Sequence, residues 1–366
     1  MALGPGRSAK AIGIDAGNCF DRPPTGVAVY ARNLTTELAR SHPNQSFVWH
    51  LRSNRYLRSF RARLPSNVTR RLGERFPGHP AVGPVALFHG LNQRLPEAAD
   101  APMVATFHDL FAMTGDYSTP GFRERFAKLA VETARRANHI IAISEHTARL
   151  VEGLLGFPRA NVTVVHHGVE ALDAPAPAEE RSILEAIDVT PPFVLHMGTI
   201  QARKNVGRLV EAFEAAGSGR QLVLAGSTGY GGPDILSRIE RSAARSRIRL
   251  PGHVGDKVRS CLYRSAECLL FPSLDEGFGL PVVEAMASGL PVITSDTSAL
   301  PEVAGDAGLL VDPLSVDAIA DGLARVLASP DLRAELAAKG LMRATAFTWR
   351  RCADQTWNAY QRLLAG

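Results

Sequence analysis

Two carboxylates, Glu276 and Glu284, lie on either side of the turn-forming segment Gly277–Pro281. The apolar run Cys268–Phe271 before them predicts a buried strand, and Pro281 suits the first position of a helix because its missing N–H is not needed there. Glu284 should then lie about one turn inside that helix, with its side chain tilted back toward the loop of Glu276. A helix N-terminus between two carboxylates is a natural seat for a phosphate. The pattern therefore suits a nucleotide-sugar, whose hydroxyls would bind the carboxylates on either side of its diphosphate.

Either glutamate alone could equally be an ordinary acidic residue near a helix start. The second pattern, two adjacent cations, decides between these interpretations. Arg203 and Lys204 follow a strand predicted at Phe193–Met197 that ends at Gly198, and Asn205 would cap the next helix. Ligands of doubly wound sheets bind at the carboxyl ends of strands. Arginine offers phosphate a bidentate fork and lysine a point charge, so the cations predict a diphosphate clamp rather than a surface ion pair.

The first half of the chain contributes weaker candidates. His108 follows a strand predicted at Val104–Phe107, and His89 holds the same position one strand earlier. A histidine at a strand's carboxyl end would face a crevice, although a lone histidine is more often structural. Gly26 precedes an amphipathic helix, where it could let a phosphate approach the backbone or could simply form the turn.

Several chemistries are disfavoured by missing patterns in the sequence. No Gly-x-Gly-x-x-Gly fingerprint for NAD or FAD is present, and no Asp-x-Asp pair suited to holding a metal on a nucleotide. There is no nucleophile elbow. The four cysteines have neither zinc-ligand nor redox spacing. We therefore expect no cofactor and no metal.

The length of 366 residues fits two domains, and short apolar runs alternate with amphipathic helical patterns almost throughout. This alternation predicts an α/β protein with two Rossmann-like domains, each a doubly wound parallel sheet. The expected boundaries are 1–170 for the first domain, 171–192 for a Pro/Ala-rich linker, 193–349 for the second domain and 350–366 for a terminal helix. The predicted strands are Ala11–Asp15, Phe47–Leu51, Val85–Phe88, Val104–Phe107, Ile140–Ile143 and Val162–Val165 in the first sheet, and Phe193–Met197, Leu222–Ala225, Cys268–Phe271, Val292–Thr294 and Leu309–Val311 in the second.

The charge is unevenly distributed. The net charge is +5, but residues 1–100 carry 14 basic against 6 acidic residues. Much of this excess lies in the arginine-rich segment 52–75, which could bind a phosphate-rich acceptor or an anionic membrane surface, or could be a solvated face. Nucleic acid is not expected as a partner, because no recognised module accompanies the charge. No apolar run predicts a signal peptide or a membrane span, so we expect a cytoplasmic protein that can bind peripherally to the inner membrane face.

The segment from Glu276 to Glu284 resembles the E-x7-E motif of retaining GT-B glycosyltransferases, specifically glycosyltransferase family 4. The resemblance covers nearly the whole chain. It extends through Gly198…Arg203-Lys204-Asn205, His108-Asp109-Leu110, Ser144-Glu145, Val165-His-His-Gly168, Pro251-Gly-His-Val254 and Leu300-Pro-Glu-Val-Ala-Gly305. One departure stands after the first strand. Relatives often have Gly-Val-Gly-Arg-Tyr there, whereas this chain has Gly26-Val-Ala28-Val-Tyr30, which puts phosphate or acceptor contacts from that loop in question.

The resemblance implies a role for each site residue. The implied catalytic residues are His108, Arg203, Lys204 and Glu276. The implied donor-binding residues are Gly26, Gly198, Arg203, Lys204, Val254, Glu276, Gly277, Phe278, Gly279, Leu280 and Glu284. Arg203 and Lys204 would hold the diphosphate, Glu284 the ribose diol, and Glu276 the transferred sugar. His108 would contact that sugar from the opposite domain, and Val254 would lie by the nucleobase.

The resemblance also implies a fold and an activity. The two domains would face a central cleft, and the terminal helix would cross back to the first domain. The activity would be retaining transfer of a hexose from a nucleotide-sugar to a glycan or lipid-linked acceptor in bacterial polysaccharide assembly. GDP-mannose is preferred as the donor over UDP-glucose or another UDP-hexose. The alternative from another class is a non-catalytic subunit that only binds nucleotide-sugar.

Overall fold

The computed structural model describes residues 11–21, 25–73, 84–97, 99–170 and 172–365. Its contacts divide the chain into two compact units. The first unit comprises Met1–Met113, Gly121–Gly168 and Trp349–Gly366, and the second comprises Thr114–Pro120 and Val169–Thr348. Arg75 of the arginine-rich segment and Ala171 at the start of the predicted linker lie outside the described residues.

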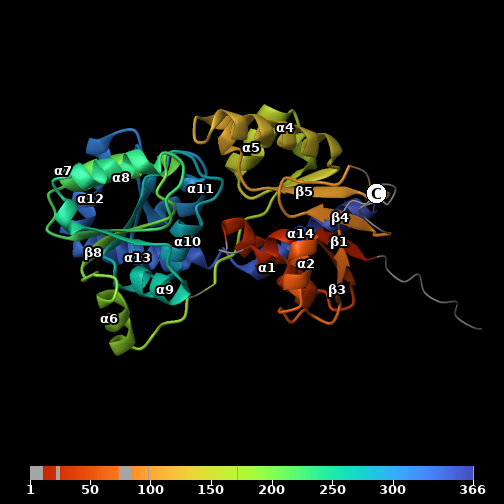
Figure 1. Ribbon diagram of the computed structural model, residues 1–366, viewed down its shortest axis with the longest axis horizontal. Coiled ribbons are helices and arrows are strands. Elements are labelled where there is room, and N and C mark those ends of the chain that lie inside the picture. The colour runs from red at the N-terminus through yellow and green to blue at the C-terminus, as the bar shows by residue number, and fades with distance from the viewer. Residues whose placement is uncertain (1–10, 22–24, 74–83, 98, 171, 366) are drawn as a thin grey trace, which may run out of the picture. The chain divides into compact units, whose positions relative to one another are not determined.

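The first unit is built on a seven-stranded parallel sheet with the order β3-β2-β1-β4-β5-β6-β7 (Figure 1). Its strands are β1 (Ile12–Asp15), β2 (Phe47–Leu51), β3 (Val68–Leu72), β4 (Leu87–Gly90), β5 (Met103–Phe107), β6 (His139–Ala142) and β7 (Val162–Val164). Six of these strands were predicted. The exception, β3, is an edge strand in which only Val68 is buried, so it lacks the apolar run on which the predictions rested.

Helices connect the strands of the first unit, as the alternating pattern predicts. They are α1 (Gly26–Ser41), α2 (Ser53–Ser59), α3 (Phe111–Thr114), α4 (Pro120–Arg136), α5 (Glu145–Leu155) and α14 (Trp349–Ala365), with 3₁₀ turns η1 (Gly17–Phe20) and η2 (Arg159–Asn161). Side-chain caps set two of the helix starts. The Thr25 hydroxyl accepts from the Ala28 N–H at 3.3 Å, and the Ser144 hydroxyl accepts from the Thr147 N–H at 3.0 Å.

The C-terminal helix α14 belongs to the first unit, which confirms its predicted return to the first domain. It packs along α1, and the buried side chains of Trp349, Cys352 and Tyr360 join the core formed by α1 and the sheet. Trp357 stacks on His42 with a ring-centroid distance of 4.0 Å. Tyr360 is buried in the core of the first unit, and Trp357 packs against that core.

The second unit contains a six-stranded parallel sheet with the order β10-β9-β8-β11-β12-β13. Its strands are β8 (Phe193–Met197), β9 (Gln221–Ala225), β10 (Ile248–Gly252), β11 (Cys268–Phe271), β12 (Val292–Ser295) and β13 (Gly308–Val311). The edge strand β10 was not predicted, because its sequence Ile-Arg-Leu-Pro-Gly carries an arginine and a proline. Two doubly wound parallel sheets are nevertheless the architecture that the sequence predicts.

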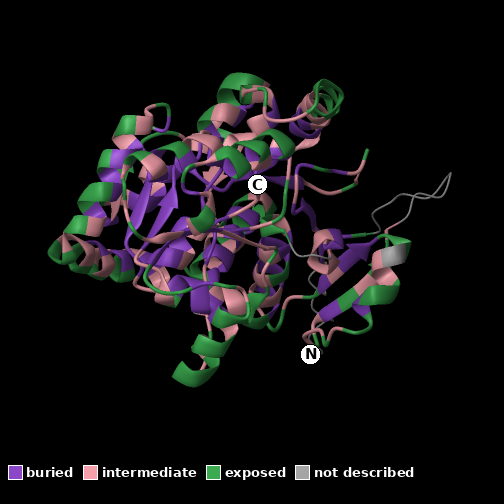
Figure 2. Cartoon of the chain, turned by 60° about the vertical axis from the view of Figure 1, so that its left-hand side comes forward, coloured by how far each residue is buried: buried purple, intermediate pink, exposed green. Residues whose placement is uncertain are grey.

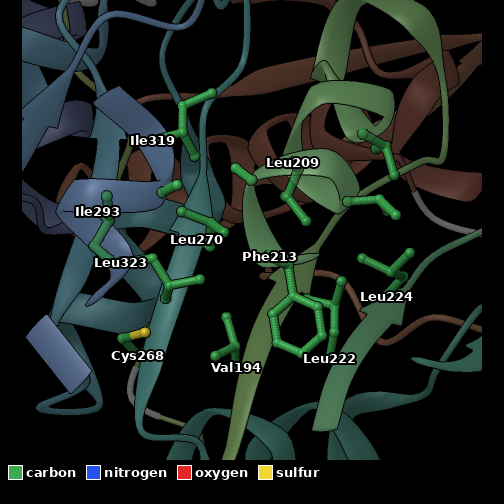
Figure 3. Close-up of a cluster of buried hydrophobic side chains, with 14 of the residues drawn as sticks. Val194, Leu209, Phe213, Leu222, Leu224, Cys268, Leu270, Ile293, Ile319 and Leu323 are labelled. Carbon is green, nitrogen blue, oxygen red and sulfur yellow. The ribbon is translucent and has the colours of Figure 1, made fainter. Parts of the chain in front are cut away.

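The helices of the second unit cover both faces of this sheet. They are α6 (Pro177–Glu185), α7 (Val206–Ala215), α8 (Gly232–Arg241), α9 (Asp256–Ser265), α10 (Leu280–Ala287), α11 (Leu300–Ala304), α12 (Val316–Ala328) and α13 (Pro330–Ala344), with 3₁₀ turns η3 (Ala202–Lys204), η4 (Arg245–Arg247) and η5 (Gly305–Ala307). On one face, Leu209 and Phe213 of α7 and Leu323 of α12 pack on Val194 and Leu270 of the strands (Figure 3). Figure 2 shows the strands as buried and the outer faces of the helices as exposed.

The segment predicted as an interdomain linker is packed in the second unit. Its helix α6 buries Leu184, and its acidic residues contact α9. Lys257 of α9 lies 2.8 Å from Glu179, and the Ser265 hydroxyl donates to Glu180. The described part of this segment, which lies between β7 and β8 in the sequence, is therefore packed against the second unit through α9.

Candidate functional site

The candidate site lies at the point where the order of strands reverses in the second sheet. β8 pairs with β9 on one side and with β11 on the other, so the carboxyl ends of β8 and β11 form the switch point at which doubly wound sheets bind ligands. The chain leaves β8 through Gly198 and η3, and it leaves β11 through a strap, Pro272–Glu276. Arg203 and Lys204 are therefore brought next to Glu276, although 72 residues separate Lys204 from Glu276 in the sequence.

Hydrogen bonds to four of its backbone carbonyl groups hold the strap in place. The Asn205 amide donates to Pro272 O at 3.0 Å, and the Ser295 hydroxyl donates to Ser273 O at 2.6 Å. Arg203 donates from Nη1 to Asp275 O. The Ala299 N–H donates to Glu276 O at 3.2 Å. Groups from three other elements thus fix the backbone of the strap that carries Glu276.

Asn205 does not cap α7 through its side chain, which corrects the sequence-based expectation. Its backbone is left-handed, with φ at 58°, and its side-chain amide donates to Pro272 O and Pro313 O instead. Asparagine tolerates this conformation better than most residues. The residue therefore ties the segment after β8 to the strap after β11, a role for which the local sequence pattern holds no signal.

Arg203, Lys204 and Glu276 form a buried ion cluster. Arg203 Nη1 lies 3.2 Å from Glu276 Oε2, and Lys204 Nζ donates to Glu276 Oε1. Lys204 Nζ also lies 4.8 Å from the centroid of the Phe271 ring. All three side chains are nearly inaccessible, with 11% exposure for each cation and 8% for the carboxylate. Buried charges of this kind are tolerated because each has an opposite charge beside it.

The two cations of this cluster lower the pKa of Glu276. Burial alone would raise the pKa of the carboxyl, but the charges of Lys204 and Arg203 and the hydrogen bond from Lys204 outweigh burial and lower it to about 2. Glu276 therefore remains an anion under all ordinary conditions. The sequence predicted that the cations bind a diphosphate; in the structure they contact Glu276, the glutamate that was assigned to the sugar.

The turn between Glu276 and α10 needs glycine at one position. Gly279 has φ at 100°, and a Cβ there would lie 2.7 Å from Leu300 Cδ2. The sequence had suggested that Pro281 occupies the first position of this helix. α10 begins one residue earlier, at Leu280, so Pro281 occupies the second position. Phe278 is buried and packs edge-on against Phe347 at 5.6 Å. The backbone of residues 277–280 is thus held in one conformation directly after Glu276.

Glu284 lies one turn inside α10, as predicted, but its carboxylate contacts α9. Tyr263 OH donates to Glu284 Oε2 at 2.9 Å, and Arg259 Nη1 donates to Glu284 Oε1 at 3.2 Å. Arg259 also lies 3.0 Å from Asp256. Burial raises the pKa of the Glu284 carboxyl, while Arg259 and Tyr263 oppose that rise. These two residues of α9 were missed by sequence reasoning, although their spacing of four places them on one helix face.

His196 is a second residue that the sequence did not single out. It is fully buried in β8, and its ring stacks on the ring of Phe271 with a centroid distance of 5.6 Å. Burial lowers the pKa of its imidazole to about 4. Its Nδ1 lies 3.2 Å from Leu270 O, so the neutral ring donates to that carbonyl. The ring lies close to Gly198, where φ is 151° and a Cβ would lie 3.7 Å from His196 Nε2.

His108, the predicted sugar contact from the first half of the chain, belongs to the first unit. Its imidazole lies 4.8 Å from the ring of Tyr30, and its Nε2 donates to Leu91 O at 2.8 Å. Burial lowers the pKa of the ring to about 4, so the neutral ring keeps Nδ1 as an acceptor. Gly26, also in the first unit, is the first residue of α1, and Val254 lies half-buried between β10 and α9 in the second unit.

The arginine-rich segment divides into structural and exposed residues. Arg70 donates to Ser59 O at 3.0 Å and to Ala62 O at 2.8 Å, which satisfies carbonyl groups at the end of α2. Its guanidinium carbon also lies 5.0 Å from the centroid of the Phe60 ring. Arg58 and Arg61 are exposed. The solvated-face interpretation therefore fails for Arg70, which has a structural role.

Both halves of this chain match known protein families. Residues 24–171 match the family described as Glycosyltransferase Family 4, and residues 179–342 match the one described as Glycosyl transferases group 1. The O-antigen chain mannosyltransferase B of Escherichia coli is 32% identical over 284 residues, which cover 76% of this chain and 74% of that protein. The serotype-specific mannosyltransferase WbdA of Escherichia coli is 29% identical over 276 residues, but the match covers only 33% of that longer protein.

Solved structures share the architecture. The structure of Anabaena Alr3699/HepE in complex with UDP and glucose superposes with a TM-score of 0.75 at 18% sequence identity, and the match covers 96% of this chain and 100% of that chain. Sucrose-phosphate synthase from Thermosynechococcus elongatus superposes with a TM-score of 0.74 at 20% identity, over 97% of this chain and 99% of that chain. At these identities the likeness shows the fold alone.

Proposed function

Because this chain belongs to glycosyltransferase family 4 and has the GT-B fold, we propose that it transfers a hexose from a nucleotide-sugar to an acceptor hydroxyl with retention of the anomeric configuration. The observation that carries this proposal is the buried cluster of Arg203, Lys204 and Glu276 at the switch point of the second sheet. Two adjacent cations in a site that excludes water fit a diphosphate, and a carboxylate beside them fits the hydroxyls of the attached sugar.

Donor binding on this proposal exchanges one anion for another. The diphosphate replaces Glu276 as the partner of Arg203 and Lys204, and the released carboxylate turns to the sugar. When the bond between sugar and diphosphate breaks, negative charge grows on the leaving diphosphate, and cations already held at that place stabilise it. The leaving diphosphate accepts the proton of the acceptor hydroxyl on the same face of the sugar, which retains the configuration. Since the protein supplies these cations, we expect transfer to continue in excess EDTA.

We propose GDP-mannose as the donor. The relative that is 32% identical is named a mannosyltransferase, and so is the longer relative. UDP-glucose is the competing donor, because a solved structure of the same fold holds UDP and glucose. Glu284 would bind the ribose diol of either nucleotide. The proposed product is a glycan or lipid-linked saccharide of bacterial polysaccharide assembly.

The test offers the purified protein GDP-mannose, UDP-glucose and other UDP-hexoses with mannose-containing acceptors, and NMR of the product determines the anomeric configuration. We expect an α-linked mannoside from the α-linked donor. A β-linked product would contradict retention. Tight donor binding without transfer or hydrolysis would instead support the non-catalytic alternative.

Membrane association is a separate part of the proposal. No helix in the described part of the chain is both long enough and apolar enough to cross a bilayer. The end of α2 and the residues directly after it nevertheless expose Leu57 by 73% and Phe60 by 61%, beside the exposed Arg58 and Arg61. Apolar side chains among cations suit the surface of an anionic membrane. We expect flotation with phosphatidylglycerol vesicles, weakened by Leu57→Ser/Phe60→Ser, and no dependence on these residues would contradict this role.

A further inference from the structure

Two residues of α9 hold the carboxylate of Glu284, one at each oxygen. Arg259 Nη1 donates to Oε1 at 3.2 Å, and Tyr263 OH donates to Oε2 at 2.9 Å. The Glu284 side chain is 14% exposed, so its carboxylate is largely withdrawn from water. A carboxylate accepts about four hydrogen bonds, shared between its oxygens. Each oxygen of Glu284 therefore keeps acceptor capacity for a further donor, and two such positions side by side suit the neighbouring hydroxyls of a ribose.

Of these two partners, only Arg259 carries a charge. Burial and the neighbouring Glu284 raise the pKa of the Tyr263 phenol well above its usual value, so the phenol stays protonated and neutral. An arginine side chain remains a cation at every ordinary pH. Burial raises the pKa of the Glu284 carboxyl, and the charge of Arg259 is the largest influence that opposes this rise. Arg259 thus supplies the charge that keeps Glu284 available as an anion.

The charged and titratable groups that act on Glu284 in the described part of the chain all lie in α9. Besides Arg259 and Tyr263 they include Asp256, whose charge raises the pKa of the Glu284 carboxyl. Asp256 Oδ1 lies 3.0 Å from Arg259 Nη2, so the guanidinium contacts both carboxylates. Asp256 is 90% exposed, and its ion pair is therefore screened by water. α11 and α13 also pack on α10, but they add no charge to this set.

The position of α9 does not depend on Arg259. α9 packs on α6 and reaches α10 through Glu284 (Figure 1). The Ser260 hydroxyl donates to Asp173 O, in the segment before α6, at 2.6 Å. Lys257 Nζ lies 2.8 Å from Glu179 of α6. A substitution of Arg259, whose side chain is 26% exposed, should therefore leave α9 in place.

We propose that Arg259 is a positioning residue for the donor, which holds Glu284 as an oriented anion and thereby sets the affinity for a ribose diol. This inference rests on the proposed function, in which Glu284 binds the ribose, and it adds the residue on which that contact depends. All the residues that it uses lie in the second unit. In Arg259→Met the carboxylate loses its cation, so a larger fraction of Glu284 is protonated at a given pH. A protonated carboxyl has less acceptor capacity for the diol.

The experiment compares GDP with its 2′,3′-dideoxy analogue, or UDP with its own, whichever base the protein binds. The two ligands share the base and the diphosphate, so the ratio of their affinities reports the contact with the diol alone. They are titrated calorimetrically, from mildly acidic to mildly alkaline pH, into the unchanged protein, Arg259→Met, Arg259→Lys and Arg264→Met. The last variant is the matched control, because Arg264 lies in the same helix but faces Glu180, at 3.6 Å.

We expect the preference for the diol at neutral pH to fall by about tenfold in Arg259→Met and to recover in part as the pH is raised. Arg259→Lys should restore most of the preference because it keeps the charge, and Arg264→Met should match the unchanged protein. Equal affinity of all four proteins for the dideoxy analogue shows that they are folded. A preference and a pH profile in Arg259→Met equal to those of the unchanged protein would overturn the inference. An equal loss in Arg264→Met would do the same, since the effect would then be one of net charge.

Asp256→Asn provides a test with the opposite sign. Because the charge of Asp256 raises the pKa of the Glu284 carboxyl, its removal should move the loss of the diol preference to lower pH. A move to higher pH would contradict the assignment of the ionising role to Arg259.

Transfer assays on the same proteins separate this inference from the proposed function. A diol preference that depends on Arg259 in a protein that transfers no sugar would contradict the proposed function and leave the inference standing. Sugar transfer by a protein that binds the two nucleotides equally would overturn the inference and leave the activity standing.

Discussion

At the scale of single residues, the proposed function makes Glu276 the partner that the donor's diphosphate displaces from Arg203 and Lys204. Its carboxylate contacts both Arg203 and Lys204. Because the pKa of Glu276 is depressed to about 2, its ion pairs contribute stability above the ordinary carboxyl pKa, and that contribution is lost as the pH falls toward 2. A cation pair that is already assembled needs little reorganisation when the diphosphate arrives.

Replacing Glu276 by glutamine tests this competition. Glu276→Gln should bind free nucleoside diphosphate at least as tightly as the unchanged protein, because a neutral amide competes less for the cations. Turnover should fall by roughly 10- to 150-fold if one charge-assisted contact to the sugar of about 1.5–3 kcal/mol is lost in the transition state. Glu284→Gln is the matched control and should weaken nucleotide binding. If Glu276→Gln weakens it more, the two roles are reversed.

Glu284 predicts a pH dependence of donor binding. Its pKa is raised by burial, so acidification protonates Glu284 before it protonates Glu276. A protonated carboxyl loses acceptor capacity for the ribose diol, and nucleotide affinity should therefore fall as the pH approaches the raised pKa from above. Tyr263→Phe removes a hydrogen bond to the carboxylate, and the fall should then begin at higher pH. The calorimetric pH profiles of the two proteins would coincide if Glu284 did not contact the nucleotide.

At the scale of elements, a hydrogen-bonded chain joins α14 to the sheet of the first unit. Tyr360 OH lies 2.5 Å from His89 Nδ1, and His89 Nε2 lies 2.8 Å from Thr106 Oγ1. Thr106 Oγ1 in turn lies 2.9 Å from Tyr30 OH. Since Tyr30 packs on His108, the C-terminal helix helps to position the predicted sugar contact.

Tyr360→Phe should destabilise the first unit, because the buried His89 Nδ1 loses its partner. The expected cost is about 1–3 kcal/mol. Urea unfolding followed by tryptophan fluorescence measures it, with Tyr230→Phe as the control since Tyr230 is exposed. A denaturation midpoint equal to that of the control would show that the hydrogen bond between Tyr360 and His89 contributes nothing to stability.

The elements that the sequence predicted best are those with the strongest local signals. Cys268–Phe271 is an uninterrupted apolar run, and the structure has a strand with the same bounds. The position of Glu284 one turn inside α10 followed from Pro281 and helix geometry. The edge strands β3 and β10 were missed because their half-exposed residues include arginines. The pairing of Glu276 with Lys204 could not be predicted, because it depends on which strands become neighbours in the sheet.

At the scale of the whole molecule, the chain returns to its first unit after completing the second. α14 contributes Trp349, Cys352 and Tyr360 to the core of the first unit, whereas Arg203, Lys204 and Glu284, which are assigned to the diphosphate and the ribose, belong to the second. Deleting residues from Arg350 onward should therefore expose the core of the first unit to proteolysis and abolish transfer. Nucleotide binding should survive in the second unit. Full transfer activity of the shortened chain would contradict this account.

The central claim is that Arg203 and Lys204 bind a diphosphate, and one calorimetric comparison tests it most directly. GDP and guanosine, or UDP and uridine, are titrated into the unchanged protein, Arg203→Ala/Lys204→Ala and the control Arg238→Ala, which breaks an exposed ion pair with Glu211. We predict that the unchanged protein and the control bind the diphosphate at least about 100-fold more tightly than the nucleoside, and that this preference disappears in the double variant. An undiminished preference for the diphosphate in the double variant would contradict the assignment.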